Sequence, residues 1–136
     1  MLESKVRAAC EKFQEILTSC EGGFIDTVTL NATREGDDLD VKLLQTQKWE
    51  AVAVFFKDVR YFSISKGTDL EGVFVDQILV SHLPKTGQAW PSGAEELVTR
   101  FDELPELYWV QFIGPSKLSV IAAIMTVTVS QDLPEN

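Results

Sequence analysis

Ionisable groups of the kind that enzymes use are scarce in this chain. It has one histidine, His82, and two cysteines, Cys10 and Cys20. The HExxH, CxxC, GxSxG, P-loop and GxGxxG motifs are all missing, which excludes the commonest metalloprotease, zinc-ribbon, hydrolase and nucleotide-binding sites. We therefore expect a protein that is not an enzyme and that uses no cofactor or metal ion.

Positive charge is also in short supply. Twelve Lys and Arg residues face 21 Asp and Glu residues, for a formal net charge of −9. Phosphate groups repel such a surface, and no basic cluster compensates, so nucleic acid and anionic membranes are excluded as partners. A basic protein is favoured instead, because opposite fields speed the encounter of two molecules.

Long hydrophobic runs are absent as well. The longest, Leu118–Val129, is interrupted by Ser119, Thr126 and Thr128. It is also shorter than the ~20 residues with which a helix spans a bilayer. The N-terminal residues carry charges where an export signal has an apolar core. These features predict a soluble, cytoplasmic protein.

The N-terminal segment predicts an amphipathic helix. Its apolar residues fall within ~120° of arc at helical spacing; they are Leu2, Val6, Ala9, Cys10, Phe13, Ile16, Leu17 and Cys20. The two cysteines would lie ~15 Å apart along this helix, whereas a disulfide requires Cα atoms within ~7 Å. We therefore expect two buried thiols. Gly22-Gly23 then offers the left-handed conformation that often follows a helix.

Alternating apolar residues predict strands through most of the remaining chain. The segments are Phe24–Ala32, Leu39–Thr46, Trp49–Lys57, Val59–Lys66, Val73–His82, Leu107–Ile113 and Lys117–Ser130. Two of these segments, Trp49–Lys57 and Val59–Lys66, are either two strands or one long strand bent at a bulge. Apolar side chains occupy both phases of Trp49–Lys57, which predicts that this strand is covered on both faces. In the last strand, one face would be filled by Ile121, Ala123, Met125, Val127 and Val129.

A second, short helix is expected before the last two strands. Ser92-Gly93-Ala94-Glu95 has the form of a capping box, and Pro105 would end the helix. The connections between strands are mostly too short for parallel crossovers. The predicted architecture is thus one α+β domain over residues 1–136. It has an N-terminal helix packed on a large, mostly antiparallel sheet of about seven strands.

Carboxylates supply the remaining candidate chemistry. Glu35, Asp37, Asp38 and Asp40 form the densest cluster, either a solvated hairpin tip or a weak calcium site that lacks EF-hand spacing. A second group is either a solvated helix end or an acid/base pair; it consists of Asp102, Glu103 and Glu106. For an enzyme without a catalytic histidine, Glu50 on a predicted core strand is the first residue to inspect.

An exposed aromatic residue would complete a contact surface. Trp90 lies outside every predicted strand, which makes it the best anchor of the three tryptophans. The candidate partner-binding surface consists of Glu35, Asp37, Asp38, Asp40, Asp69, Glu71 and Trp90. A second copy of the chain is a further expected partner, because a long apolar final strand needs its edge covered.

Several short motifs resemble a family of bacterial polymorphic-toxin immunity proteins. They are Phe24-Ile25-Asp26, Arg34-Glu35-Gly36, Leu39-x-Val41, Val54-x-Phe56-x-Asp58-Val59 and the closing strand Leu118–Val129. The resemblance covers roughly residues 24–82 and 107–130, and Ile25 stands where that family has histidine. It implies a small protein without enzymatic activity that neutralises a toxin by binding it.

The first hypothesis is accordingly a non-enzymatic protein-binding domain, immunity-like, that acts through an acidic surface. The alternative is a small-molecule-binding α+β domain with its pocket between the first helix and a curved sheet. That alternative requires a closed apolar cavity of ~300 Å³ or more with a few converging polar groups.

Overall fold

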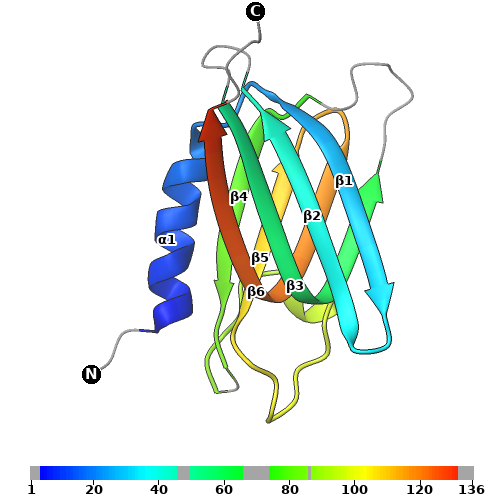
Figure 1. Ribbon diagram of the computed structural model, residues 1–136. Coiled ribbons are helices and arrows are strands. Elements are labelled where there is room, and N and C mark those ends of the chain that lie inside the picture. The colour runs from blue at the N-terminus through cyan, green and yellow to red at the C-terminus, as the bar shows by residue number, and fades with distance from the viewer. Residues whose placement is uncertain (1–3, 46–49, 66–73, 86, 132–136) are drawn as a thin grey trace, which may run out of the picture.

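The computed structural model describes residues 4–45, 50–65, 74–85 and 87–131 (Figure 1). In this part of the chain, one α-helix packs on an antiparallel sheet of six strands, so the expected α+β class is confirmed. The elements are α1 (Lys5–Thr18), β1 (Phe24–Thr33), β2 (Gly36–Leu44), β3 (Glu50–Ser65), β4 (Gln77–Leu83), the 3₁₀ turn η1 (Ala94–Glu96), β5 (Leu107–Ile113) and β6 (Lys117–Gln131). The strand order is β1-β2-β3-β6-β5-β4.

Two long strands fold this sheet into two layers. β3 and β6 pair along nearly their whole length, but β2 pairs only with residues 51–57 of β3, and β5 only with residues 117–122 of β6. The first layer therefore contains β1, β2, residues 50–57 of β3 and residues 124–131 of β6. The second layer contains β4, β5 and the other halves of β3 and β6. In Figure 1 the first layer faces the viewer and the second lies behind it.

The corner between the layers lies at Asp58. Its φ angle is 57°, in the left-handed region that Asp tolerates better than most side chains. The pairing register also shifts between Val59 and Tyr61, as at a β-bulge. Strands that change layer at such a bend allow two sheets to pack face to face. Residues 50–65 thus form one bent strand, and the prediction of seven strands is corrected to six within the described residues.

The space between the layers is filled by the first hydrophobic cluster. Its fully buried side chains include Leu17 from α1, Leu39 and Val41 from β2, Val54 and Phe56 from β3, and Val110 and Phe112 from β5. Burying one such side chain is worth ~1.5–3 kcal/mol. Because the cluster draws on α1 and both layers, it holds the three parts of the domain together.

Helix α1 lies along the outer edge of β4. The side chain of Gln14 donates to the carbonyl of Ile78 at 2.8 Å and accepts from the N–H of Val80 at 2.7 Å. Glu21 accepts from the N–H of Ile78 at 2.9 Å. These bonds satisfy backbone groups that an edge strand otherwise leaves open. The helix begins after Ser4, whose side chain caps the first turn.

The end of α1 brings the two ends of the sheet together. Gly22 has a φ of 91°, the left-handed conformation expected after the helix. Its N–H donates to the carbonyl of Val75 at 2.7 Å, and the N–H of Val75 donates to Gly23 at 3.0 Å. The start of β1 is thereby tied to the segment that precedes β4. Cys10 and Cys20 are both buried thiols, as predicted.

A second hydrophobic cluster covers the outer side of the second layer. Its buried side chains are Leu83, Trp90, Ala94, Val98, Leu104, Leu107, Trp109 and Ile121. The expected second helix is not formed there, because only the three residues of η1 are helical. Gly93, with a φ of 91°, takes the N-cap position, and no side chain caps the turn. A glycine in a helix costs ~1 kcal/mol, and this segment packs as an irregular chain instead.

Two expectations about buried strand faces are wrong. Only one face of the first half of β3 is fully covered: Phe55 is exposed and Ala53 is half-buried, while Trp49 lies outside the described residues. On β6, Ile121 belongs to the second cluster and Met125 to the first, so these two residues lie on opposite faces. The corner explains this difference, because side chains change faces where both strands bend.

Candidate functional site

The structure separates the acidic residues that the sequence groups together. Asp38 and Asp40 point outward from β2, away from the first cluster, whereas Leu39 between them is buried. Asp37 lies on the face opposite to Asp38, because successive residues of a strand alternate. Glu35 lies in the two-residue turn between β1 and β2. Only Asp38 and Asp40 therefore share a face of the sheet.

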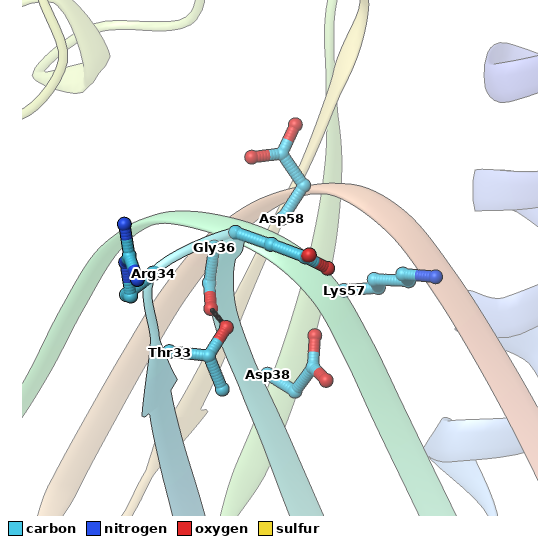
Figure 2. A pocket seen from close by; sticks show the side chains of 7 residues that line it. Thr33, Arg34, Gly36, Asp38, Lys57 and Asp58 are labelled. Atoms are coloured by element: carbon cyan, nitrogen blue, oxygen red, sulfur yellow. Dashed lines mark hydrogen bonds between the residues drawn. The ribbon is translucent and has the colours of Figure 1, made fainter.

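The turn between β1 and β2 borders a surface hollow of about 500 Å³. It is lined by Thr33, Arg34, Glu35, Gly36, Asp38, Lys57 and Asp58. Figure 2 shows Asp38 and Lys57 on neighbouring strands, with the carboxylate of Asp58 directed away from both. Asp58 instead forms an ion pair with Arg60, at 2.8 Å. The hollow thus presents charges of both signs rather than the purely acidic surface that was expected.

The outer side of the first layer forms an exposed surface, which we call the bare face. It consists of Thr27, Thr29 and Asn31 of β1, Asp38, Asp40 and Lys42 of β2, Ala53, Phe55 and Lys57 of β3, and Ile124, Thr126 and Thr128 of β6. Nine of these twelve side chains are exposed, and the other three are half-buried. Figure 1 shows this side of the sheet with no described element in front of it.

Phe55 lies at the centre of the bare face. The pairing register sets it between Asp40 on β2 and Thr126 on β6. Its side chain is 37% exposed, and Ile124, its diagonal neighbour on β6, is 47% exposed. Diagonal neighbours on a sheet are close enough for such side chains to interact. The result is a small apolar patch bordered by a carboxylate and a hydroxyl group.

Asp40 has an unusual environment. Its Oδ1 atom is buried and accepts no hydrogen bond from the described residues. A buried acceptor without a donor typically costs about 1–3 kcal/mol, more when it is charged. Such a group is uncommon among the buried polar atoms of a stable fold.

Trp90 belongs to the second cluster rather than to an exposed surface. It is only 9% exposed, and its Nε1 donates to the carbonyl of Pro84 at 2.6 Å. The guanidinium group of Arg100 lies over its ring, 4.5 Å from the centroid. Trp90 therefore anchors the segment that covers the second layer, which corrects its expected role as a surface anchor. Asp69 and Glu71 lie outside the described residues.

A second hollow, of about 400 Å³, lies between α1 and β4. It is lined by Arg7, Cys10, Glu11, Gln14, Val80 and His82. Burial, together with the carboxylates of Glu106 and Glu11, raises the pKa of the Cys10 thiol to about 12. The thiol is therefore protonated at neutral pH and unsuited to nucleophilic catalysis. This groove is open to solvent, so it is not the closed apolar cavity that the small-molecule hypothesis requires.

His82 and Glu106 secure the start of α1. His82 Nε2 lies 3.3 Å from Glu106 Oε1, and Ser4 Oγ donates to Glu106 Oε2 at 2.7 Å. Ser4 is also the N-cap of α1, so this chain of contacts links the helix to β4. Glu106 thus has a structural role, and the side chain of Glu50 lies outside the described residues. The described residues contain no group of three or more His, Cys, Asp or Glu side chains able to hold a metal ion.

Sequence reasoning missed the exposure of Phe55 and Ile124. Both occur in apolar stretches and were assigned to buried strands. One signal was present: β6 places Thr126 and Thr128 on the phase of Ile124, and polar residues at alternate positions indicate an exposed face. The exposure of Phe55 follows only once β3 is paired with β6.

Comparisons of this chain with protein-family models, with curated proteins and with solved structures found no match. Among the described residues, no helix has the length and apolar character needed to cross a membrane.

Proposed function

We propose that this protein is a non-enzymatic binding domain that recognises another protein through the bare face. The observation that carries the proposal is the position of Phe55, exposed at the centre of that face beside the unpartnered Oδ1 of Asp40. Aromatic side chains with polar neighbours are enriched at the centres of protein interfaces and often dominate the binding energy.

The proposed partner supplies two complementary features. An apolar pocket would take Phe55 and Ile124, and an Arg or Lys side chain would donate to the half-buried carboxylate of Asp40 in a charge-assisted hydrogen bond. The net charge of −9 favours a basic partner and speeds its approach. Lys42 and Lys57 lie on either side of the row formed by Asp40, Phe55 and Thr126. They would fix how the partner aligns with the sheet.

The difference between the two layers supports this assignment. The outer side of the second layer is covered by the second cluster, in which Trp90, Ala94 and Val98 pack on the strands. On the outer side of the first layer, Phe55 and Ile124 remain exposed. Binding by a face of this kind also suits an immunity-like role, in which a toxin is neutralised by contact alone.

The test is a capture experiment with two matched phenylalanine variants. The full chain is immobilised, exposed to a lysate of the organism that produces it, and the bound proteins are identified by mass spectrometry. Phe55→Ser removes the proposed anchor. Phe101→Ser changes another exposed phenylalanine, at 48% against 37% for Phe55, outside the bare face.

The proposal expects one basic protein to be captured by the wild type and by Phe101→Ser, and to be lost with Phe55→Ser. Removal of a central aromatic anchor typically costs about 2 kcal/mol or more, a loss of roughly thirtyfold in affinity. Capture that is insensitive to Phe55, or no captured protein at all, would contradict the proposal.

A further inference from the structure

The outer edge of β1 is an open strand edge. In the described part of the sheet β1 has a single full neighbour, β2, and Figure 1 shows it as the outermost strand of the first layer. Every second residue of an edge strand turns its N–H and C=O outward, where they can pair with another strand. The residues from Thr27 to Thr33 contain no charge, proline or glycine, so nothing in their composition opposes such pairing.

The opposite edge of the sheet is protected. Gln14 and Glu21 of α1 occupy the outward backbone groups of Ile78 and Val80 on β4. On β1, by contrast, Leu30 remains 45% exposed although it lies on the same face as the first cluster. An added strand would continue that face and cover Leu30.

We propose that β1 pairs antiparallel with β1 of a second copy of this chain, about a two-fold axis at Leu30. The two-fold axis would bring Leu30 opposite Leu30 of the second copy, and Val28 opposite Ala32 of the second copy. This pairing would extend the inner apolar face across the dimer. The outer positions would pair Thr29 with Asn31 of the second copy, both of them uncharged and able to form hydrogen bonds.

Charge complementarity singles out a second copy as the occupant of this edge. The neutral stretch is bounded by Asp26 at one end and Arg34 at the other, both exposed. A two-fold axis at Leu30 brings Asp26 of each copy, at the bulge in β1, near Arg34 of the other, in the β1–β2 turn, so two attractive pairs flank the contact. Neither residue forms an ion pair within the part of the chain that the structure describes. Two molecules that each carry a charge of −9 would thus meet where no like charges are opposed.

A charge-swap experiment tests this arrangement. The molar mass of the full chain is measured by light scattering after size-exclusion chromatography, from ~5 to ~500 µM, the range in which a small interface dissociates. Asp26→Arg opposes two arginines and Arg34→Asp opposes two carboxylates, each twice per dimer by symmetry. The double variant Asp26→Arg/Arg34→Asp restores both attractive pairs. Glu96→Arg, at an exposed position on η1, makes the same change of net charge as Asp26→Arg but away from β1.

The proposal expects a dimer for the wild type, for the double variant and for Glu96→Arg, and at least about tenfold weaker association for each single variant. A wild type that remains monomeric throughout the concentration range would overturn it. So would a dimer that both single variants leave unchanged, because the copies would then meet elsewhere. These outcomes do not depend on the bare face, so the two proposals fail separately.

Discussion

The side-chain amide of Gln14 takes the place of a neighbouring strand for Ile78. It donates to the Ile78 carbonyl at 2.8 Å, and the same amide accepts from the N–H of Val80 at 2.7 Å. A glutamine amide carries the same donor and acceptor as a peptide group, so it can cap two positions of an open edge at once. The packing of α1 on β4 therefore rests on polar contacts as well as on the first cluster.

The Gln14→Ala variant should be less stable than the wild type by about 2 kcal/mol, because it leaves two partly buried backbone groups unpaired. Urea denaturation followed by circular dichroism measures this difference. Glu15→Ala, at an exposed position on the same helix, should change stability by less than ~0.5 kcal/mol. Equal effects of the two substitutions would mean that Gln14 contributes only through helix propensity.

The corner at Asp58 makes a second prediction. Asp58→Val should destabilise the domain by about 2 kcal/mol, because a β-branched side chain is strained at a φ of 57°. Asp58→Asn should stay within ~0.5 kcal/mol of the wild type, since asparagine tolerates this conformation and the exposed ion pair with Arg60 contributes little. Thermal unfolding compares the two variants directly. If Asp58→Asn is instead strongly destabilised, the ion pair with Arg60 contributes more to stability than the backbone conformation of residue 58 does.

Local patterns predicted the parts of the fold that depend on neighbouring residues. The apolar stripe of α1, the conformation of Gly22 and the hairpin that turns before Gly36 all follow from spacing and backbone chemistry. The polar pair Lys57-Asp58 was equally compatible with a break or a bend. The bend depends on how β3 pairs with β6, which is a contact between residues far apart in sequence.

The candidate site depends on long-range packing to a greater degree than the fold does. Phe55 and Phe56 differ little in their local sequence, yet one is exposed and the other fully buried. Which face of a strand stays open depends on where the segment containing Trp90 packs, and that segment covers the second layer rather than the first. Trp90 itself was expected at the surface because no strand pattern includes it. Its hydrogen bond to Pro84 and its contact with Arg100 are tertiary interactions that spacing does not reveal.

The buried thiol of Cys10 predicts a loss of stability at alkaline pH. Burial, with help from Glu106 and Glu11, raises its pKa from 9.0 to about 12, so the folded protein keeps a proton that the unfolded chain releases above pH 9. Stability should therefore fall as pH rises from 9 towards 12, by about 1 kcal/mol between pH 8 and pH 10. Urea midpoints at these two values measure the change.

Cys10→Ala is the control for that measurement. It should lower stability at pH 8 by removing a buried side chain, but the decline from this thiol between pH 8 and pH 10 should disappear. Burial also raises the pKa of Tyr108, which adds to the decline only above its ordinary value of 10.0. An unchanged slope in Cys10→Ala would assign the alkaline sensitivity to other groups.

Asp40 allows the binding proposal to be tested through stability, without knowledge of the partner. Its Oδ1 is buried and accepts no hydrogen bond from the described residues, so replacing the carboxylate should stabilise the isolated domain. Asp40→Thr should raise the free energy of unfolding by about 1 kcal/mol more than Asp38→Thr does. Both changes substitute a good strand former on the outer side of β2, so their difference reports the unpartnered oxygen rather than strand propensity. Urea denaturation gives the two values. If Asp40→Thr proves the less stable variant, Asp40 contributes to the fold, and the argument for a partner's donor at this position no longer holds.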